Sequence, residues 1–275
     1  MPGPSSVTQR GKTEPFELQV SRGDIAFHIP VNIFGYSSGI GNTTTPQTIW
    51  EGANNATQNN YTYLSTASQL TLVSTSSADT GTIYIAGLDK NFNLLSEYIV
   101  LNGTTPVTSV NSYLRVNGLY ATSFTNAGTI SAKVSTTAYG YINPGVGQSQ
   151  MGVYTVPNGY TFYQAYLQAN STLANQAVLF QEQRSYNIAS TRIENGYSIT
   201  HNNNVIDYGL SPFSTGFFNI PFITPFPLSQ GTDLQWQAKT NSGGINGAVS
   251  VFVGGYLIKN TGDGPVQLGQ LQNGI

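Results

Sequence analysis

The sequence predicts an all-β protein with two consecutive antiparallel β-sandwich domains, of which the second is jelly-roll-like. Short segments alternate polar and apolar residues, and Asn, Gly, Asp and Pro separate them at intervals of about 8–12 residues. Segments with the 3.6-residue period of a helix are scarce. Strands of this length joined by tight turns pair into antiparallel sandwiches or barrels.

Four strands are predicted in the first half of the chain. In each, apolar side chains recur at alternate positions, as a strand with one buried face requires. Turn-forming pairs such as Asn102-Gly103 and Asn117-Gly118 separate them, because Asn and Gly tolerate the positive φ of tight hairpins. The predicted strands cover residues 69–73, 82–85, 96–101 and 113–116.

The second half continues the same pattern. Four prolines lie between residues 212 and 227, and proline cannot donate to a strand ladder, so this segment is predicted to be an edge strand or a packed loop. An amphipathic helix over residues 163–184 is the competing interpretation, which the polar interruption at residues 170–172 disfavours. The other predicted strands cover residues 153–156, 161–168, 177–184, 231–239, 248–253 and 255–258.

A domain boundary is predicted at residues 140–150, where Gly and Pro are dense. A chain of 275 residues has room for two domains of ordinary size. The predicted division is an N-terminal arm (1–24), a first sandwich (25–139), the linker (140–150), a jelly-roll-like sandwich (151–260) and an extended tail (261–275).

The composition is poor in charge. Asp, Glu, Lys and Arg make up 8% of the chain, against roughly 25% in ordinary soluble domains. Neutral hydroxyls and amides cost less to bury than charges do, so this surface suits a protein that lies against copies of itself or other subunits. It suits an enzyme poorly, because most catalysis needs titratable groups held close together.

The same counts argue against several partners and locations. The net charge is −2, and nucleic-acid binding would need clustered Lys and Arg. There is no apolar run of about 18 residues, so no transmembrane helix is expected. The start of the sequence has no apolar signal-peptide core, so we expect synthesis in a cytoplasm.

Charge gathers at the N-terminus. The first 24 residues hold six of the 22 charged side chains. One interpretation is a solvated, mobile terminus. The other is an arm whose charges pair with a neighbouring subunit, with Arg10, Lys12 and Arg22 as the candidate partner-binding residues.

We predict no catalytic, cofactor or metal site. His28 and His201 are the only histidines and cysteine is absent, so neither a zinc site nor a serine triad is supported. Glu182, Glu194 and Asp207 are the candidate carboxyls for glycoside hydrolysis, but nothing in their spacing selects a pair.

Residues 89–93 begin like a calcium-binding EF-hand loop, with oxygen-bearing side chains at the first, third and fifth positions. Such a loop needs Gly at its sixth position and Glu at its twelfth. Leu94 and Val100 stand there, so a hairpin turn is predicted instead.

Aromatic residues are abundant, with 17 Tyr and 13 Phe. Exposed tyrosine on a low-charge β surface is a usual way to bind sugars or neighbouring protein. We assign the phenylalanines mostly to the core and expect several tyrosines at interfaces.

Several segments resemble virion structural proteins of marine tailed bacteriophages. Residues 15–36 resemble the opening of such proteins, and residues 87–107 with 113–117 resemble a later part. Residues 156–159 and 228–233 carry the resemblance into the second half. The resemblance implies a place in a virion. The matching segments are β-hairpin sequences and not active-site signatures, so the resemblance supplies no catalytic residues.

The resemblance and the composition together predict a non-enzymatic virion component, made in the host cytoplasm. The first expectation is an accessory capsid protein of the decoration, cement or head-fibre type. It would be a homotrimer that binds the major capsid protein or other virion subunits and stabilises the shell. The alternatives are a receptor- or glycan-binding module on a phage appendage, and a head–tail or tail-ring component.

Overall fold

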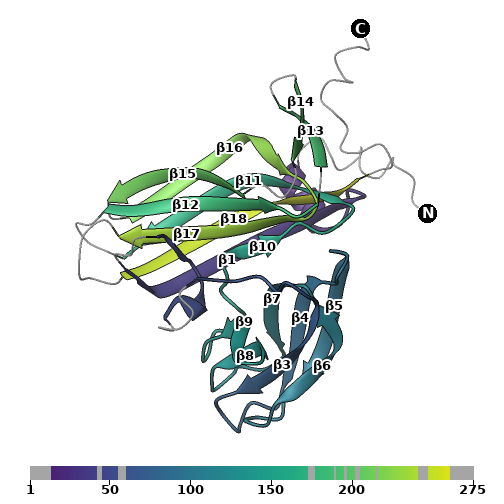
Figure 1. Ribbon diagram of the computed structural model, residues 1–275, viewed down its shortest axis with the longest axis vertical. Coiled ribbons are helices and arrows are strands. Elements are labelled where there is room, and N and C mark those ends of the chain that lie inside the picture. The colour runs from purple at the N-terminus through teal and green to yellow at the C-terminus, as the bar shows by residue number, and fades with distance from the viewer. Residues whose placement is uncertain are drawn as a thin grey trace.

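The structure, a computed structural model, describes residues 14–41, 45–54, 60–172, 177–188, 190–194, 197–201, 205–214, 216–240 and 247–260. Antiparallel strands make up most of it (Figure 1). The helical segments among these residues are α2 (Phe16–Ser21) and the 3-10 turn η1 (Glu51–Asn54). The prediction of an all-β, antiparallel protein is confirmed.

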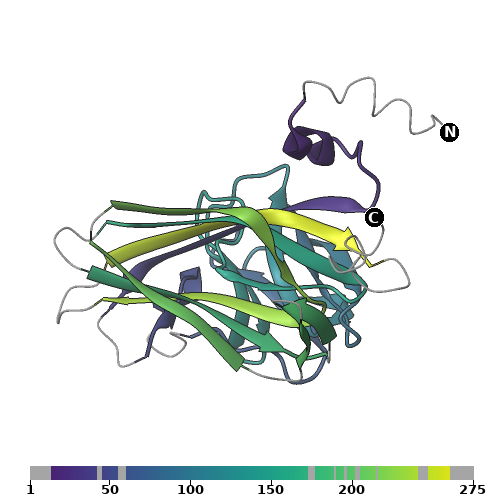
Figure 2. The same ribbon diagram turned by 90° about the horizontal axis from the view of Figure 1, so that it is seen from above.

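Two sheets face each other in the larger part of the molecule, which we call the large unit (Figure 2). One sheet has the order β1-β18-β11-β16, and the other has the order β10-β17-β12-β15 with β2 also paired to β17. The strands are β1 (His28–Ile40), β2 (Gln47–Thr48), β10 (Val153–Thr155), β11 (Tyr160–Ser171), β12 (Ala177–Tyr186), β15 (Val205–Ser214), β16 (Gly216–Leu228), β17 (Thr232–Thr240) and β18 (Gly247–Lys259).

A second pair of sheets forms the small unit, which lies below the large unit in Figure 1. Its sheets have the orders β6-β3-β8-β9 and β5-β4-β7. The strands are β3 (Ser68–Ser74), β4 (Thr82–Leu88), β5 (Leu94–Val100), β6 (Val107–Tyr113), β7 (Arg115–Thr122), β8 (Ile130–Val134) and β9 (Thr137–Ile142). A separate hairpin pairs β13 (Ser190–Glu194) with β14 (Tyr197–His201).

Both units bury the apolar side chains that the alternation places on one face of each strand. Leu72 of β3 and Ile83 of β4 are fully buried in the small unit. Phe162, Trp236 and Val253 are fully buried in the large unit. Each such side chain contributes about 1.5–3 kcal/mol relative to exposure, so alternating burial is the main source of stability in both units.

The predicted order of two consecutive domains needs correction. β1 pairs with β18 over most of its length, from His28 opposite Ile258 to Ser37 opposite Val249. The strands β1 and β2, which the sequence analysis assigned to the first sandwich, therefore belong to the large unit. The small unit is inserted between β2 and β10. Alternation in a sequence shows which face of a strand is buried but not which strand it pairs with.

The predicted linker at residues 140–150 is shorter and more structured than expected. β9 runs to Ile142. Beyond it, Gly145 donates a backbone hydrogen bond to Asn126 and Ser149 donates one to Leu119, both 2.8 Å long. These bonds tie the connection to the small unit, so it is a packed connection.

Two predictions about the second half have clear outcomes. β15 and β16 lie at the edges of their sheets, which confirms an edge position for the proline-rich segment.

The competing helix over residues 163–184 is wrong, because β11 and β12 cover most of it. Phe162 and Leu167 are buried core residues there.

The described part of the N-terminal arm lies against the large unit. The ring of Phe16, on α2, contacts the rings of His28 and Tyr256 edge-on, with centroid distances of 5.7 and 5.3 Å. Residues 1–13 lie outside the described part, as does the predicted tail at residues 261–275. The arm from residue 14 onward is therefore a helical turn packed on the β1–β18 pair.

Candidate functional site

A row of three tyrosines crosses the outer face of the sheet β5-β4-β7. Tyr84 on β4 stands opposite both Tyr98 on β5 and Tyr120 on β7. The ring centroids of Tyr84 and Tyr98 lie 4.9 Å apart, and those of Tyr84 and Tyr120 lie 6.1 Å apart. Tyr98 is 68% exposed. We call these three residues the tyrosine row, and it is open to solvent at its β5 end.

Strand alternation explains why the row faces outward. Ile83, Ile85 and Ile99 point into the small unit and are at most 5% exposed. Successive side chains of a strand point to opposite faces, so Tyr84 and Tyr98 point away from the core. The sequence partly indicated this orientation, because the segments 82–85 and 96–101 were predicted as strands in which Tyr stands at the same alternate positions as the polar residues. The row itself was missed, because the register between strands is not visible in a sequence.

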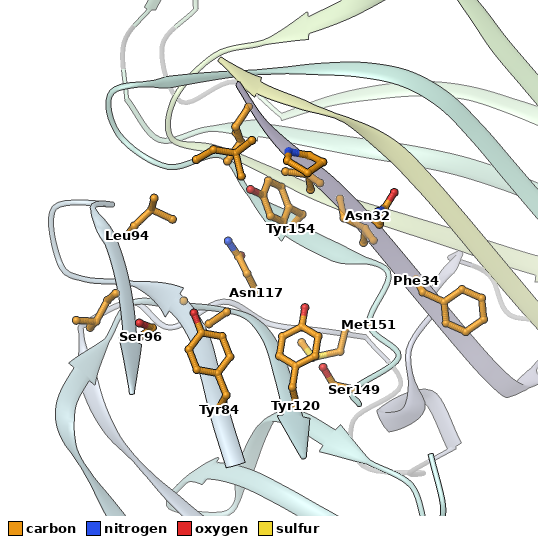
Figure 3. A pocket seen from close by; sticks show the side chains of 18 residues that line it. Asn32, Phe34, Tyr84, Leu94, Ser96, Asn117, Tyr120, Ser149, Met151 and Tyr154 are labelled. Atoms are coloured by element: carbon orange, nitrogen blue, oxygen red, sulfur yellow. The ribbon is translucent and has the colours of Figure 1, made fainter. Parts of the chain in front are cut away.

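A cleft of about 600 Å³ lies between the tyrosine row and β1 of the large unit (Figure 3). Tyr84 and Tyr120 point into it from the small unit, and Tyr154 lies across from them. Asn32 on β1 and Ser96 on β5 add an amide and a hydroxyl to its wall. Every described residue that lines the cleft is uncharged, so the cleft is polar and aromatic but electrically neutral.

Asn117 at the floor of the cleft joins the two units. Its side-chain oxygen accepts a hydrogen bond from the Thr155 backbone N–H at 3.0 Å, and its amide donates to the Thr155 carbonyl at 3.1 Å. The β4–β7 register shifts there, with Ala86 opposite Gly118 and Gly87 opposite Val116. The predicted turn at Asn117-Gly118 is therefore wrong: Asn117 is the extra residue of a β-bulge, which re-aims its side chain.

An ion pair between the units lies close to this contact. The Nε and Nη2 atoms of Arg115 on β7 donate to the two carboxylate oxygens of Asp233 on β17, at 2.8 and 2.9 Å. The side chains are 7% and 4% exposed. Thr155 and Asn187 also donate to the Asp233 carboxylate, at 2.5 and 2.6 Å. This interunit ion pair holds the small unit on the large unit and so sets the shape of the cleft.

The hydroxyls of Tyr120 and Tyr154 stay protonated at neutral pH. Burial raises the pKa of Tyr120, and the neighbouring Tyr84 raises it further. Burial also raises the pKa of Tyr154, with a smaller contribution from Tyr120. A phenol that keeps its proton can both donate and accept a hydrogen bond, so these groups suit a neutral polar ligand.

Of the three predicted partner-binding residues, Arg10 and Lys12 lie outside the described residues. The Arg22 guanidinium forms exposed ion pairs with Glu14 and Asp24, the latter at 2.8 Å. Arg22 therefore pairs within its own arm. Its role toward another subunit stays a prediction.

Of the three candidate catalytic carboxyls, the structure describes the side chain of Glu182 alone. Glu182 is 5% exposed and accepts hydrogen bonds from Trp236 at 3.0 Å, Gln164 at 3.1 Å and Arg184 at 2.6 Å. These contacts hold β11, β12 and β17 together. Glu194 lies on β13 and Asp207 on β15, and their side chains lie outside the described part.

His28 and the segment 89–93 take structural positions. The His28 ring lies 2.8 Å from the Ala26 carbonyl oxygen through Nδ1. His201 ends β14, and its side chain is not described. The Asp89 carboxylate accepts the backbone N–H groups of Asn91 and Asn93, at 2.8 and 2.9 Å, in the β4–β5 hairpin, which confirms the predicted turn.

The described ranges contain neither a metal-binding cluster nor a membrane-spanning helix. Within them, no group of three or more His, Cys, Asp or Glu is arranged to hold a metal ion. No helix within them is long and apolar enough to cross a membrane.

Comparison with known proteins gives little further information. No family model and no curated protein matches the chain. Among solved structures, the chain is similar to the infectious bursal disease virus Gt strain structure, with 13% identity, a TM-score of 0.16, and coverage of 89% of this chain and 77% of that chain. The VP2 subviral particle of the same virus gives 13% identity, a TM-score of 0.14, and 86% and 77% coverage. Likeness at this level supports no conclusion about fold or function.

Proposed function

We propose that this chain is a non-enzymatic structural component of a tailed-phage virion, most specifically an accessory capsid protein of the decoration, cement or head-fibre type. It would form a homotrimer and bind the assembled shell across joints between major capsid subunits. Anything that binds only the assembled state stabilises that state by mass action. The proposed mechanism is therefore adhesion.

The observation that carries this proposal is where the few charges lie. Arg115 with Asp233, and Glu182 with Arg184, are buried between strands. Asp79 is 1% exposed and binds the backbone N–H groups of Ala127 and Gly128. With these charges used in internal contacts, the exposed side chains that the structure describes on the sheet faces are mainly uncharged, and uncharged groups cost less to desolvate than charges do.

The strand order of the large unit also supports the proposal. Most successive strands from β10 to β18 cross to the opposite sheet, and the first and last strands, β1 and β18, pair with each other. We infer a jelly roll, the eight-stranded double sheet that occurs in viral capsid and lectin domains. The small unit is then a second sandwich inserted into it. The fold alone does not select between those functions, so it supports the proposal only together with the distribution of charge.

A salt series on purified virions tests adhesion by neutral surface. The full-length protein should remain bound from about 0.1 to 1 M NaCl, over which the Debye length falls from roughly 10 to 3 Å. Contacts between apolar and hydroxyl groups lose little of their binding free energy under that screening. Exposed ion pairs contribute only about 0–1 kcal/mol each and are screened by salt. Retention is measured by sedimentation and quantitative gel analysis.

A variant with Arg10, Lys12 and Arg22 all replaced by Ala separates the two interpretations of the arm. If these residues bind a neighbouring subunit, the variant should leave the virion at lower salt while its thermal unfolding is unchanged. Equal retention of the variant and the wild type would support the interpretation of the arm as a solvated, mobile terminus. Release of the full-length protein by moderate salt would contradict adhesion by neutral surface.

A further inference from the structure

The cleft between the units has the chemistry of a site for an uncharged, hydroxyl-rich ligand. Its described lining carries no formal charge. Anionic ligands such as nucleic acids are bound by clustered Lys and Arg that replace counterions, and that lining offers none. The cleft wall contains both apolar side chains and neutral amides and hydroxyls, which suits a ligand with both C–H faces and hydroxyl edges.

The tyrosine row provides a stacking surface that leads into this cleft. Neighbouring rings of the row are tilted by 47° and 41° to one another, so together they form a broad aromatic platform. Tyr98 at the outer end is 68% exposed, and Tyr120 at the inner end is 38% exposed. An aromatic ring presents a flat apolar face beside a polar tip, which matches the C–H face and hydroxyl rim of a sugar ring.

Polar groups with unused hydrogen-bonding capacity surround the platform. The Asn32 side-chain oxygen accepts from the Tyr166 hydroxyl at 3.3 Å, which leaves the Asn32 amide N–H groups to donate. Ser149 Oγ accepts from the Leu119 backbone N–H at 2.9 Å, so its own hydroxyl proton can be donated to a ligand. Within the described part of the chain, the hydroxyls of Tyr84, Tyr98 and Tyr120 form no hydrogen bond.

We propose that the cleft binds a neutral oligosaccharide. Tyr98 and Tyr84 stack on successive sugar rings, and Tyr120, Asn32 and Ser149 bind the hydroxyls of the ring that enters the cleft. This site goes beyond the adhesive role proposed above and does not depend on it. A second copy of this chain is the alternative occupant, and analytical ultracentrifugation distinguishes it from a saccharide.

Isothermal titration calorimetry with the purified full-length protein tests the site. The probes are neutral hexasaccharides of glucose, mannose and galactose, and a hexamer of galacturonic acid is the charged comparison. At least one neutral probe should bind, and the acidic hexamer should bind more weakly, because no cation in the described lining compensates its carboxylates. Failure of every neutral hexasaccharide to bind at millimolar concentration would overturn the proposal.

Variants locate the binding to the platform. Tyr98→Ala and Tyr84→Ala should each weaken binding about 2- to 12-fold, the range that corresponds to one aromatic contact. Tyr98→Phe keeps the ring and should retain nearly all of the affinity. Val110→Ala, at a position on β6 that is 82% exposed, is the matched surface control and should leave affinity unchanged.

Two results would contradict this assignment. One is equal affinity of the wild type, Tyr98→Ala and Tyr84→Ala. The other is concentration-dependent dimerisation in analytical ultracentrifugation that Tyr98→Ala abolishes, which would assign the row to a contact between copies. Because these measurements use isolated protein, they give the same answer wherever the protein lies in a virion.

Discussion

Replacing Arg115 by alanine should lower the free energy of unfolding by about 3–5 kcal/mol, because it leaves the buried Asp233 carboxylate without its ionic partner. Arg115 also donates from Nη1 to the carbonyl oxygens of Leu64 and Leu114, at 2.9 and 2.8 Å. Its guanidinium lies 4.7 Å from the centre of the Tyr63 ring. All of these contacts are lost in the variant.

The loss should also change how the protein unfolds. Arg115 belongs to the small unit and Asp233 to the large unit, so the pair couples the two sheet pairs beside the apolar core that runs through both. In the variant, urea unfolding should separate into two transitions, with the wild type unfolding more cooperatively. Intrinsic fluorescence and circular dichroism, followed together, detect this separation, since two probes coincide only when unfolding is two-state.

The matched control is Arg22→Ala. Arg22 also pairs with two carboxylates, but its side chain is 35% exposed. An exposed ion pair contributes about 0–1 kcal/mol, so this variant should unfold almost as the wild type does. If Arg115→Ala costs as little as Arg22→Ala, the interunit ion pair does not hold the units together.

Replacing Glu51 by glutamine should remove a pH dependence of stability worth about 3 kcal/mol between pH 4 and pH 8. Glu51 is 6% exposed. Burial raises its pKa from 4.5 to about 7, although hydrogen bonds from the backbone N–H groups of Gln150 and Asn143 oppose the rise. The folded protein therefore holds a proton that the unfolded chain releases between these two pKa values.

The sign of the effect follows from that proton. Below pH 4.5 the Glu51 side chain is neutral in both states and costs nothing by ionisation. As the pH rises toward 7, the unfolded chain ionises freely while the folded protein resists, so this group lowers stability progressively. Glutamine does not titrate, so the stability of Glu51→Gln relative to the wild type should increase from acid to alkaline pH.

Urea unfolding of both proteins at several pH values between 4 and 8 measures this difference. Glu17→Gln, at an exposed position on α2, is the control for the chemical change from glutamate to glutamine. A difference between Glu51→Gln and the wild type that does not change with pH would contradict a buried, proton-holding Glu51. Glu51 accepts hydrogen bonds from both ends of the 143–150 connection. The protonation of Glu51 should therefore affect the stability of the junction between the units.

The sequence predicted the strands of this fold better than their arrangement. Segments such as 69–73 and 82–85 bury alternate apolar residues on one face, and the structure places them in β3 and β4. The four prolines between residues 212 and 227, which cannot donate a backbone hydrogen bond, correctly predicted an edge position for this segment. These features depend on local alternation and backbone chemistry, which a single sequence displays directly.

The arrangement was missed because it depends on contacts between distant segments. Ile33 of β1 pairs with Val253 of β18, and nothing in either segment identifies the other. Arg115 and Asp233 are 118 positions apart, so their pairing has no local signal. The tyrosine row likewise depends on the register of three strands.

The most direct test of the proposed virion role is a cryo-electron microscopy map of the virion in which we propose that this chain lies. We expect density for the two sheet pairs at fixed positions on the outside of the capsid, in copies related by a threefold axis and bridging major capsid subunits. Absence of the protein from purified particles, or density for it only on the tail, would contradict the proposal of an accessory capsid protein.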